Sequence, residues 1–122
     1  MKRGLIVDDS AVIRKVASRI LELLHFASAT AANGHRALDI CAAAMPDVIL
    51  LDWKLPQTDT LEFLRALRAL PGGGEPKVIY CATENDSVAI GRALRAGADD
   101  VMLKPFDRLA IEEKLAANGL LG

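Results

Sequence analysis

Several features of secreted, membrane-bound or metal-thiolate proteins are scarce in this chain. It has two cysteines, Cys41 and Cys81, and because both lie in apolar stretches without CxxC spacing, we expect reduced, buried thiols rather than a disulfide or a metal pair. Long apolar runs are also missing. The N-terminal run at residues 5–7 is too short for a signal peptide or a membrane span, and it stops at Asp8. We therefore expect a cytoplasmic protein with no membrane insertion.

Charge of neither sign is in excess. The chain has 15 Lys and Arg residues against 16 Asp and Glu, a net charge of −1, and its basic residues form no block. This balance argues against nucleic acid or an anionic membrane as the default partner. The glycine run at residues 72–74 lacks the lysine and hydroxyl residue of a nucleotide-binding loop, so we interpret it as a flexible connection. We interpret His25, near a predicted helix end, and His35, in a predicted turn, as surface residues.

The chain does contain a regular alternation of short apolar runs and helical stretches. At 122 residues it is long enough for one domain with a core, without a repeat, a second domain or a low-complexity tail. The predicted strands are residues 4–7, 27–31, 48–52, 78–82 and 101–103. The predicted helices follow Ser10, run through residues 37–44, 61–70 and 86–96, and follow Asp107. Strict alternation predicts an α/β fold, with a five-stranded parallel sheet, right-handed crossovers and helices on both faces.

The helix after Ser10 shows an apolar stripe at helical spacing, with polar side chains on its other face. The stripe consists of Val12, Ile13, Val16, Ile20, Leu23 and Leu24. The polar face consists of Arg14, Lys15, Arg19 and Glu22.

Polar residues follow the predicted strands. Asp52 ends the apolar run at residues 48–51, which is typical of a central strand buried on both faces. Taken alone, this carboxylate either lines a ligand crevice or caps the next turn. The polar residues at strand ends are Asp8, Asp9, Asp52, Thr83 and Lys104. Because they follow four different strands, a parallel sheet would bring them together along one edge.

Such a cluster can support phosphoryl transfer. Three converging carboxylates repel one another, so at neutral pH they hold a proton or recruit a cation. Oxygen ligands without a nearby cysteine or histidine favour Mg²⁺. An ionised Asp52 beside such an ion can attack a phosphoryl group and carry it as an aspartyl phosphate. The Lys104 ammonium would neutralise charge on the phosphoryl oxygens, and the Thr83 hydroxyl would hydrogen-bond to one of them.

Six short motifs carry a family resemblance. They are VDDS at 7–10, AANG at 31–34, ILLDWKLP at 49–56, AT at 82–83, GADD at 97–100 and LKPFD at 103–107. In this order and spacing, the chain resembles a receiver domain of bacterial two-component response regulators, of the single-domain type found in the chemotaxis regulator. The resemblance implies a flavodoxin-like doubly wound fold with strand order 2-1-3-4-5. It also implies that residues 1–122 form one receiver domain with no effector domain.

The resemblance assigns the acidic residues. It implies that Asp52 is the phosphoacceptor and that Asp9 and Asp52 bind Mg²⁺. Asp8 would support the ion through water, and Lys54 would contribute its main-chain carbonyl. A histidine kinase or a histidine phosphotransfer protein would donate the phosphoryl group.

The resemblance also implies how phosphorylation changes the surface that binds a target protein. Thr83 would be the switch hydroxyl and Lys104 the phosphate-pairing lysine, with a cis bond between Lys104 and Pro105. Phosphorylation would shift a two-state equilibrium and change the face formed by the fourth helix, fifth strand and fifth helix, to which an unknown protein target binds. On that face lie Arg92, Arg95, Val101 and Lys114. The arginines are equally consistent with ordinary solvated helix residues.

Three departures from the family pattern stand out. Thr58 and Thr60 occupy loop positions where the family usually has a Met and a Gly, so we expect a differently shaped loop without easy access to positive φ. Val101 replaces the usual Tyr or Phe, which argues against coupling by an aromatic flip. Lys54 and Asn85 are expected to alter how water reaches the phosphoryl group and so to tune its lifetime.

Two other functions are compatible with these residues. A hydrolase with an aspartyl-phosphate intermediate would share Asp52 and Lys104, although such enzymes typically have a second carboxylate where this chain has Lys54. Turnover of a phosphomonoester would favour it. A phosphorylation-independent adaptor would share the fold, and a phosphate-dependent change in partner affinity would argue against it.

Overall fold

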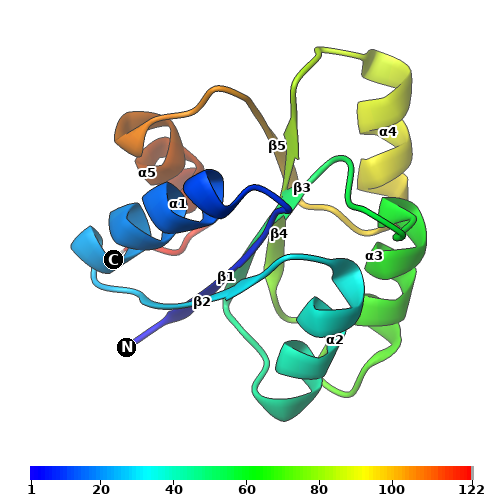
Figure 1. Ribbon diagram of the computed structural model, residues 1–122, viewed down its shortest axis with the longest axis horizontal. Coiled ribbons are helices and arrows are strands. Elements are labelled where there is room, and N and C mark those ends of the chain that lie inside the picture. Colours follow the sequence, from blue (N-terminus) through cyan, green and yellow to red (C-terminus); the bar gives the residue numbers. More distant parts are fainter. Residues whose placement is uncertain (122) are drawn as a thin grey trace.

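The computed structural model describes residues 1–121, in which five strands alternate with five helices (Figure 1). The strands are β1 (Arg3–Val7), β2 (Ala27–Ala31), β3 (Val48–Asp52), β4 (Lys77–Ala82) and β5 (Asp100–Leu103). The helices are α1 (Ala11–Leu23), α2 (Gly34–Ala43), α3 (Thr60–Ala69), α4 (Ser87–Ala96) and α5 (Arg108–Ala117). Every predicted element is present, with bounds that differ by a few residues. None of the helices in this described range is long and apolar enough to cross a membrane.

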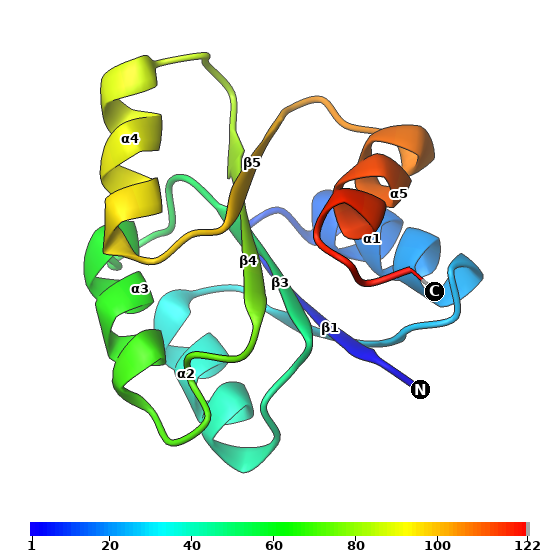
Figure 2. The same ribbon diagram turned by 180° about the vertical axis from the view of Figure 1, so that it is seen from behind.

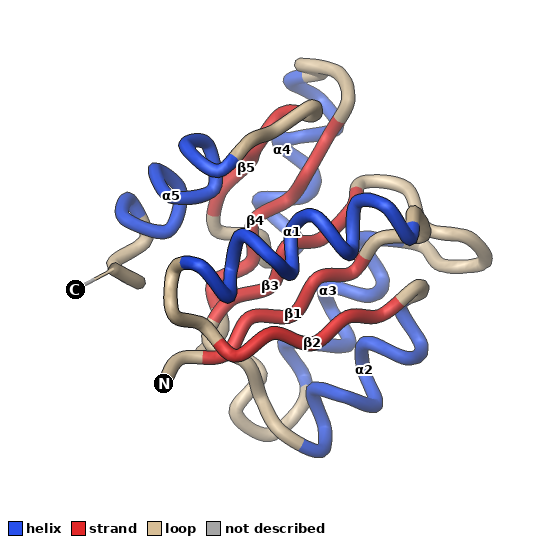
Figure 3. The backbone as a smooth tube through the Cα atoms, turned by 60° about the vertical axis from the view of Figure 1, so that its left-hand side comes forward, coloured by secondary structure: helices blue, strands red, loops and turns tan. Residues whose placement is uncertain are grey.

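The strands form one parallel sheet in the order β2-β1-β3-β4-β5, which confirms the predicted fold class. Helices α1 and α5 cover one face of the sheet, and α2, α3 and α4 cover the other (Figures 1 and 2). The chain runs outward from β1 to β2 and then returns to β3 on the other side of β1 (Figure 3). This reversal opens a crevice at the carboxyl ends of β1 and β3.

Strand β3 is buried along its whole length, and no residue in it is more than 5% exposed. Ile49 and Leu51 pack into the core under α2, α3 and α4, whereas Val48 and Leu50 pack into the core under α1 and α5. A strand covered on both faces needs consecutive apolar residues, which explains why its sequence does not alternate. Only its last residue, Asp52, is polar.

Helix α1 buries only part of the stripe that was predicted, including Ile20. Its buried residues are Ala17, Ile20 and Leu21, whereas Val12 and Val16 are 70% and 49% exposed. The small Ala17 side chain lets the helix approach the sheet closely, and a Cβ on Gly4 in β1 would lie 2.6 Å from Leu21 Cδ1. The prediction was wrong because it counted only the larger apolar side chains.

The amino-terminal edge of β4 and β5 is closed by the Arg68 guanidinium of α3. It donates to the carbonyl oxygens of Gly73, Pro76 and Gly97 at 3.0, 2.7 and 2.6 Å. It also pairs with Asp99 Oδ2 at 2.9 Å. One half-buried guanidinium therefore joins α3 to the turn after it and to the α4–β5 turn.

The glycine run at residues 72–74 forms the turn after α3. Gly72 has φ of +76°, and a Cβ on Gly73 would lie only 1.9 Å from the Leu67 carbonyl oxygen. The run is a connection, as predicted, and these two positions need glycine for their backbone shape.

Candidate functional site

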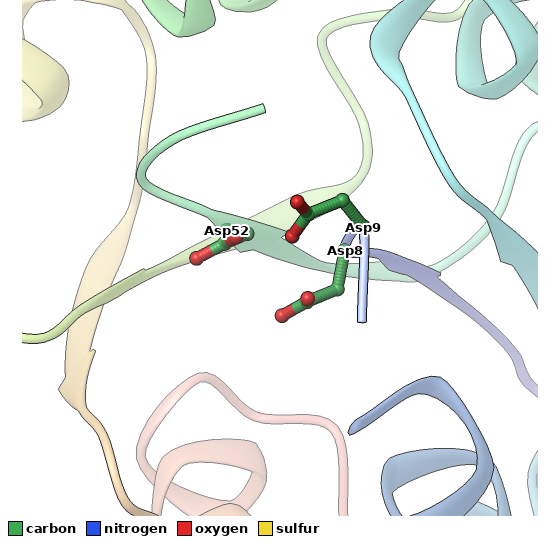
Figure 4. A group of neighbouring side chains, drawn as sticks. All are labelled: Asp8, Asp9 and Asp52. Carbon is green, nitrogen blue, oxygen red and sulfur yellow. The ribbon is translucent and has the colours of Figure 1, made fainter. Parts of the chain in front are cut away.

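Three carboxylates meet beyond the ends of β1 and β3. Asp52 is the last residue of β3, and Asp8 and Asp9 directly follow β1. Because Val7 pairs with Leu51 in the parallel ladder, the next residues along the two strands come side by side. Oxygen atoms of Asp8, Asp9 and Asp52 lie within 4.8 Å of one another. Figure 4 shows the three side chains extending into the same space.

The Lys104 ammonium joins this cluster from the segment after β5. Its Nζ donates to Asp8 Oδ2 at 2.8 Å and to Asp52 Oδ1 at 2.9 Å. The three side chains are largely buried, with exposed fractions of 13% for the lysine and 4% and 6% for the aspartates. The bond between Lys104 and Pro105 is cis, as predicted. Asp52 does not cap the next turn, because within residues 1–121 its side chain accepts only from Lys104, and Asp59 caps α3.

The electrostatics of the cluster favour additional positive charge. Burial raises the pKa of Asp52, and the charges of Asp8 and Asp9 raise it further, against the lowering effect of the Lys104 hydrogen bond. Burial opposes the charged form of Lys104, but its hydrogen bonds to the two carboxylates and the attraction of their charges together outweigh burial and raise the pKa of the lysine. A single ammonium therefore does not fully compensate three neighbouring carboxylates.

A cleft of about 450 Å³ opens beside the carboxylates. It is lined by Asp9, Asp52, Trp53, Lys54, Leu55, Pro56 and Lys104. Asp9 is exposed at its mouth, whereas Asp8 lies deeper and accepts a hydrogen bond from the Ser10 N–H at 2.9 Å. The possible metal ligands among the lining side chains are carboxylate oxygens, and the lining contains no cysteine or histidine. This set fits Mg²⁺, which prefers oxygen ligands and commonly keeps several waters.

Thr83 lies beside Lys104 but apart from the three carboxylates. It is exposed one residue beyond β4, and it lines an adjacent apolar cavity of about 330 Å³ with Lys104. Its hydroxyl makes no hydrogen bond within residues 1–121. The main chains of the two segments are close, because the Lys104 N–H donates to the Ala82 carbonyl at 2.7 Å. The structure thus places Thr83 and Lys104 on the wall of one cavity, at the same edge of the sheet as the carboxylates.

Comparison with known proteins identifies the domain. Residues 5–116 match the response regulator receiver domain. The chain belongs to this family. It is therefore a receiver domain of two-component systems, as the motifs predicted.

Individual relatives support the family and the fold. The receiver domain is 41% identical over 115 residues to the response regulator MprA of Mycobacterium tuberculosis and 40% identical to that of Mycolicibacterium vanbaalenii. These matches cover 93% of the chain but only 47% of each relative, so the chain spans about half their length.

Solved structures agree. The chemotaxis response regulator CheY4 of Vibrio cholerae superimposes with a TM-score of 0.91 at 29% identity, covering 96% of this chain and 98% of that one. The receiver domain of the sensor histidine kinase PA1611 from Pseudomonas aeruginosa, solved with a magnesium ion in its active-site cleft, gives a TM-score of 0.86 at 27% identity, with 95% of each chain covered.

The loop between β3 and α3 contains the two threonines that depart from the family pattern. Thr60 begins α3 and needs no positive φ, whereas Gln57 adopts φ of +53°. Thr60 Oγ1 donates to the Trp53 carbonyl at 3.1 Å, and Thr58 Oγ1 accepts from the Gly34 N–H at 3.3 Å. Sequence reasoning missed both contacts, although it singled out both threonines.

Other predicted residues of the receiver domain lie away from the cluster. His25 and His35 are exposed, as expected, but His35 is in the first turn of α2 rather than in a turn between elements. On the α4/β5/α5 side, Arg92 and Arg95 are exposed and Val101 is half-buried.

Proposed function

We propose that Asp52 of this receiver domain accepts a phosphoryl group from a histidine kinase or a histidine phosphotransfer protein. The observation that carries this proposal is that only one of the two Asp52 carboxylate oxygens accepts a hydrogen bond from the described residues. Oδ1 accepts the Lys104 hydrogen bond at 2.9 Å, whereas Oδ2 accepts none from residues 1–121, and the residue lines the open cleft. The free oxygen forms the new bond to phosphorus, the bond from phosphorus to the donor imidazole nitrogen breaks, and its electron pair stays on the imidazole.

We propose that the same cleft holds Mg²⁺ through Asp9, Asp52 and the main-chain carbonyl of Lys54. Both oxygens of Asp8 already accept hydrogen bonds, from the Ser10 N–H and from Lys104, which suits a supporting role through water. The magnesium ion in the similar Pseudomonas receiver domain supports this assignment. When bound, Mg²⁺ supplies positive charge that the phosphoryl oxygens need during transfer.

Lys104 and Thr83 complete the proposed site. The ammonium holds Asp52 in place before transfer and pairs with a phosphoryl oxygen afterwards. The Thr83 hydroxyl, which is free in this structure, hydrogen-bonds to another phosphoryl oxygen when its loop moves inward. That movement is the proposed link between the site and the rest of the domain.

The proposed output is a change in protein binding on the α4/β5/α5 face in the cytoplasm. Arg92 and Arg95 are exposed there and available to a partner, whereas Lys114 already pairs with Asp100 at 3.1 Å. Moving the two-state equilibrium from mostly inactive to mostly active needs on the order of 5 kcal/mol. A few charge-assisted hydrogen bonds to the phosphoryl group supply energy of that order. We also propose that the chain acts as a single receiver domain and that the partner on this face is a protein.

Labelling with a small phosphodonor tests the proposal. Wild-type protein incubated with acetyl phosphate and Mg²⁺ should gain one phosphoryl group by intact mass spectrometry, and Asp52→Asn should gain none. Asp39→Asn is the matched control, because Asp39 is exposed on α2. Full labelling of the Asp52 variant would contradict the acceptor assignment. Equal partner affinity with and without phosphorylation would favour the adaptor function instead.

A further inference from the structure

The loop between β3 and α3 is tied down by two threonine hydroxyls. Thr60 is only 8% exposed, and its Oγ1 donates to the Trp53 carbonyl at 3.1 Å. Thr58 Oγ1 donates to the Pro56 carbonyl at 3.1 Å and accepts from the Gly34 N–H, the first residue of α2, at 3.3 Å. The loop therefore has one tether at its base and one at its tip.

These contacts restrain the residues on both sides of Lys54. Trp53 uses both of its main-chain groups, because its N–H donates to the Cys81 carbonyl at 2.8 Å and its carbonyl accepts from Thr60. The Trp53 carbonyl belongs to the planar peptide unit that joins it to Lys54, so the Thr60 hydroxyl sets the direction of that plane. On the other side, Leu55 is 5% exposed and bridges to Thr58. Lys54 lies between two restrained neighbours.

Packing alone does not fix this part of the loop. An open surface cleft of about 240 Å³ adjoins it, lined in part by Trp53, Thr60 and Tyr80. On that side the loop faces solvent rather than other protein atoms. The directional hydrogen bond from Thr60 is thus the specific restraint on the Trp53–Lys54 peptide.

We propose that Thr60 is a positioning residue for the metal. Its hydroxyl holds the Trp53–Lys54 peptide, and Leu55 is restrained on the other side, so the rotation of the intervening Lys54–Leu55 peptide is limited. The carbonyl of that peptide would then be kept available to an ion in the cleft that Lys54 lines with Asp9 and Asp52. The inference rests on the proposed function, because it takes this carbonyl as a Mg²⁺ ligand. Mg²⁺ demands near-ideal octahedral geometry, whereas Ca²⁺ accepts variable geometry, so a misplaced carbonyl should affect Mg²⁺ more.

The test compares metal binding by Thr60 variants, measured by calorimetry on the full chain. Thr60→Val removes the hydroxyl at nearly constant volume and should weaken Mg²⁺ binding about tenfold, as loss of groups that orient a ligand commonly does. Ca²⁺ binding should weaken less, so the ratio of the two affinities should fall. Thr60→Ser, which keeps the hydroxyl, should stay within about twofold of wild type.

Controls separate this role from a purely structural one. Thr30→Val makes the same chemical change at an exposed position of β2 and should leave both affinities unchanged. If Thr60→Val does not fold, Thr60→Ala is used in its place, because it also lacks the hydroxyl. Unchanged Mg²⁺ affinity in a folded variant without the hydroxyl would overturn the inference, as would an equal loss for Mg²⁺ and Ca²⁺. Absence of Mg²⁺ binding by wild type would overturn the proposed function itself.

Discussion

Asp52 ends β3 and Asp100 begins β5, and the surroundings of the two carboxylates move their pKa values in opposite directions. Burial dominates at Asp52, and its pKa is raised. Burial also disfavours the charged form of Asp100, but hydrogen bonds from the Val101 N–H, Lys114 and Asn118 outweigh it and lower the pKa. The ionised form of one carboxylate therefore costs folding free energy, and that of the other contributes it.

The raised pKa of Asp52 predicts that Asp52→Asn stabilises the fold. Above its folded-state pKa, ionised Asp52 is less favourable in the fold than in the unfolded chain, so the neutral amide should increase the free energy of unfolding at pH 7 without Mg²⁺. The gain should disappear as the pH falls through that pKa. Urea unfolding of both proteins across a pH series measures it, and a variant less stable at pH 7 would contradict the electrostatic account.

Asp100→Asn should show the opposite sign. A lowered pKa means that ionised Asp100 contributes stability above the unfolded-state value, and this stability is lost as the pH falls through the folded-state pKa. At pH 7 the variant should be less stable than wild type, because it loses the ionised partner of Lys114. The loss should be only about 1 kcal/mol, because the Lys114–Asp100 pair is partly exposed to solvent. The same urea series provides the comparison, and a stability equal to wild type at pH 7 would argue against a role for the Lys114 pair.

At the scale of elements, the sequence predicted which segments form helices and strands better than it predicted which face of α1 is buried. Four strands were evident because each contains a short apolar run between turn residues and helical stretches, whereas β2, with the sequence Ala-Ser-Ala-Thr-Ala, carries a weaker signal. The face of α1 depends on Ala17, whose small side chain carries little hydrophobic signal but allows close packing on the sheet. The caps were predictable where the side chain is local, as for Ser10 and Asp107, which accept from N–H groups three residues ahead.

Arg68 joins elements whose contact was not visible in the sequence. Because its guanidinium makes hydrogen bonds to three carbonyls and to Asp99, Arg68→Ala should lower the free energy of unfolding by about 2–3 kcal/mol. Arg65→Ala is the matched control, since Arg65 lies one turn earlier on α3 and is exposed. Urea unfolding measures both. Equal effects of the two substitutions would show that the Arg68 guanidinium adds no specific stability.

At the scale of the whole molecule, parallel topology explains why distant residues share one site. Asp8, Asp52 and Lys104 lie at the ends of β1, β3 and β5 and are separated by 44 or more positions in the sequence. The Lys104 ammonium nevertheless contacts Asp8 at 2.8 Å and Asp52 at 2.9 Å. This convergence was predictable, because in a parallel sheet all carboxyl ends lie on one edge. The position of Thr83 outside the carboxylate cluster was not, since a strand end fixes the edge but not the path of the following loop.

The Thr58 and Thr60 contacts, in the loop between β3 and α3, were also not predictable from the sequence. Each hydroxyl bonds to a main-chain group whose position depends on the whole loop path, including the positive φ at Gln57. Sequence reasoning marked both threonines only as departures. The local pattern could not indicate which main-chain groups they would meet.

The measurement that tests the proposed function most directly asks whether Asp52 accepts the phosphoryl group. Borohydride reduction of the acetyl-phosphate-treated protein converts an aspartyl phosphate into homoserine, and peptide mass spectrometry then locates it. The account predicts homoserine at position 52 alone, and only when Mg²⁺ was present during phosphorylation. Homoserine at position 8 or 9, or no conversion at position 52, would contradict it.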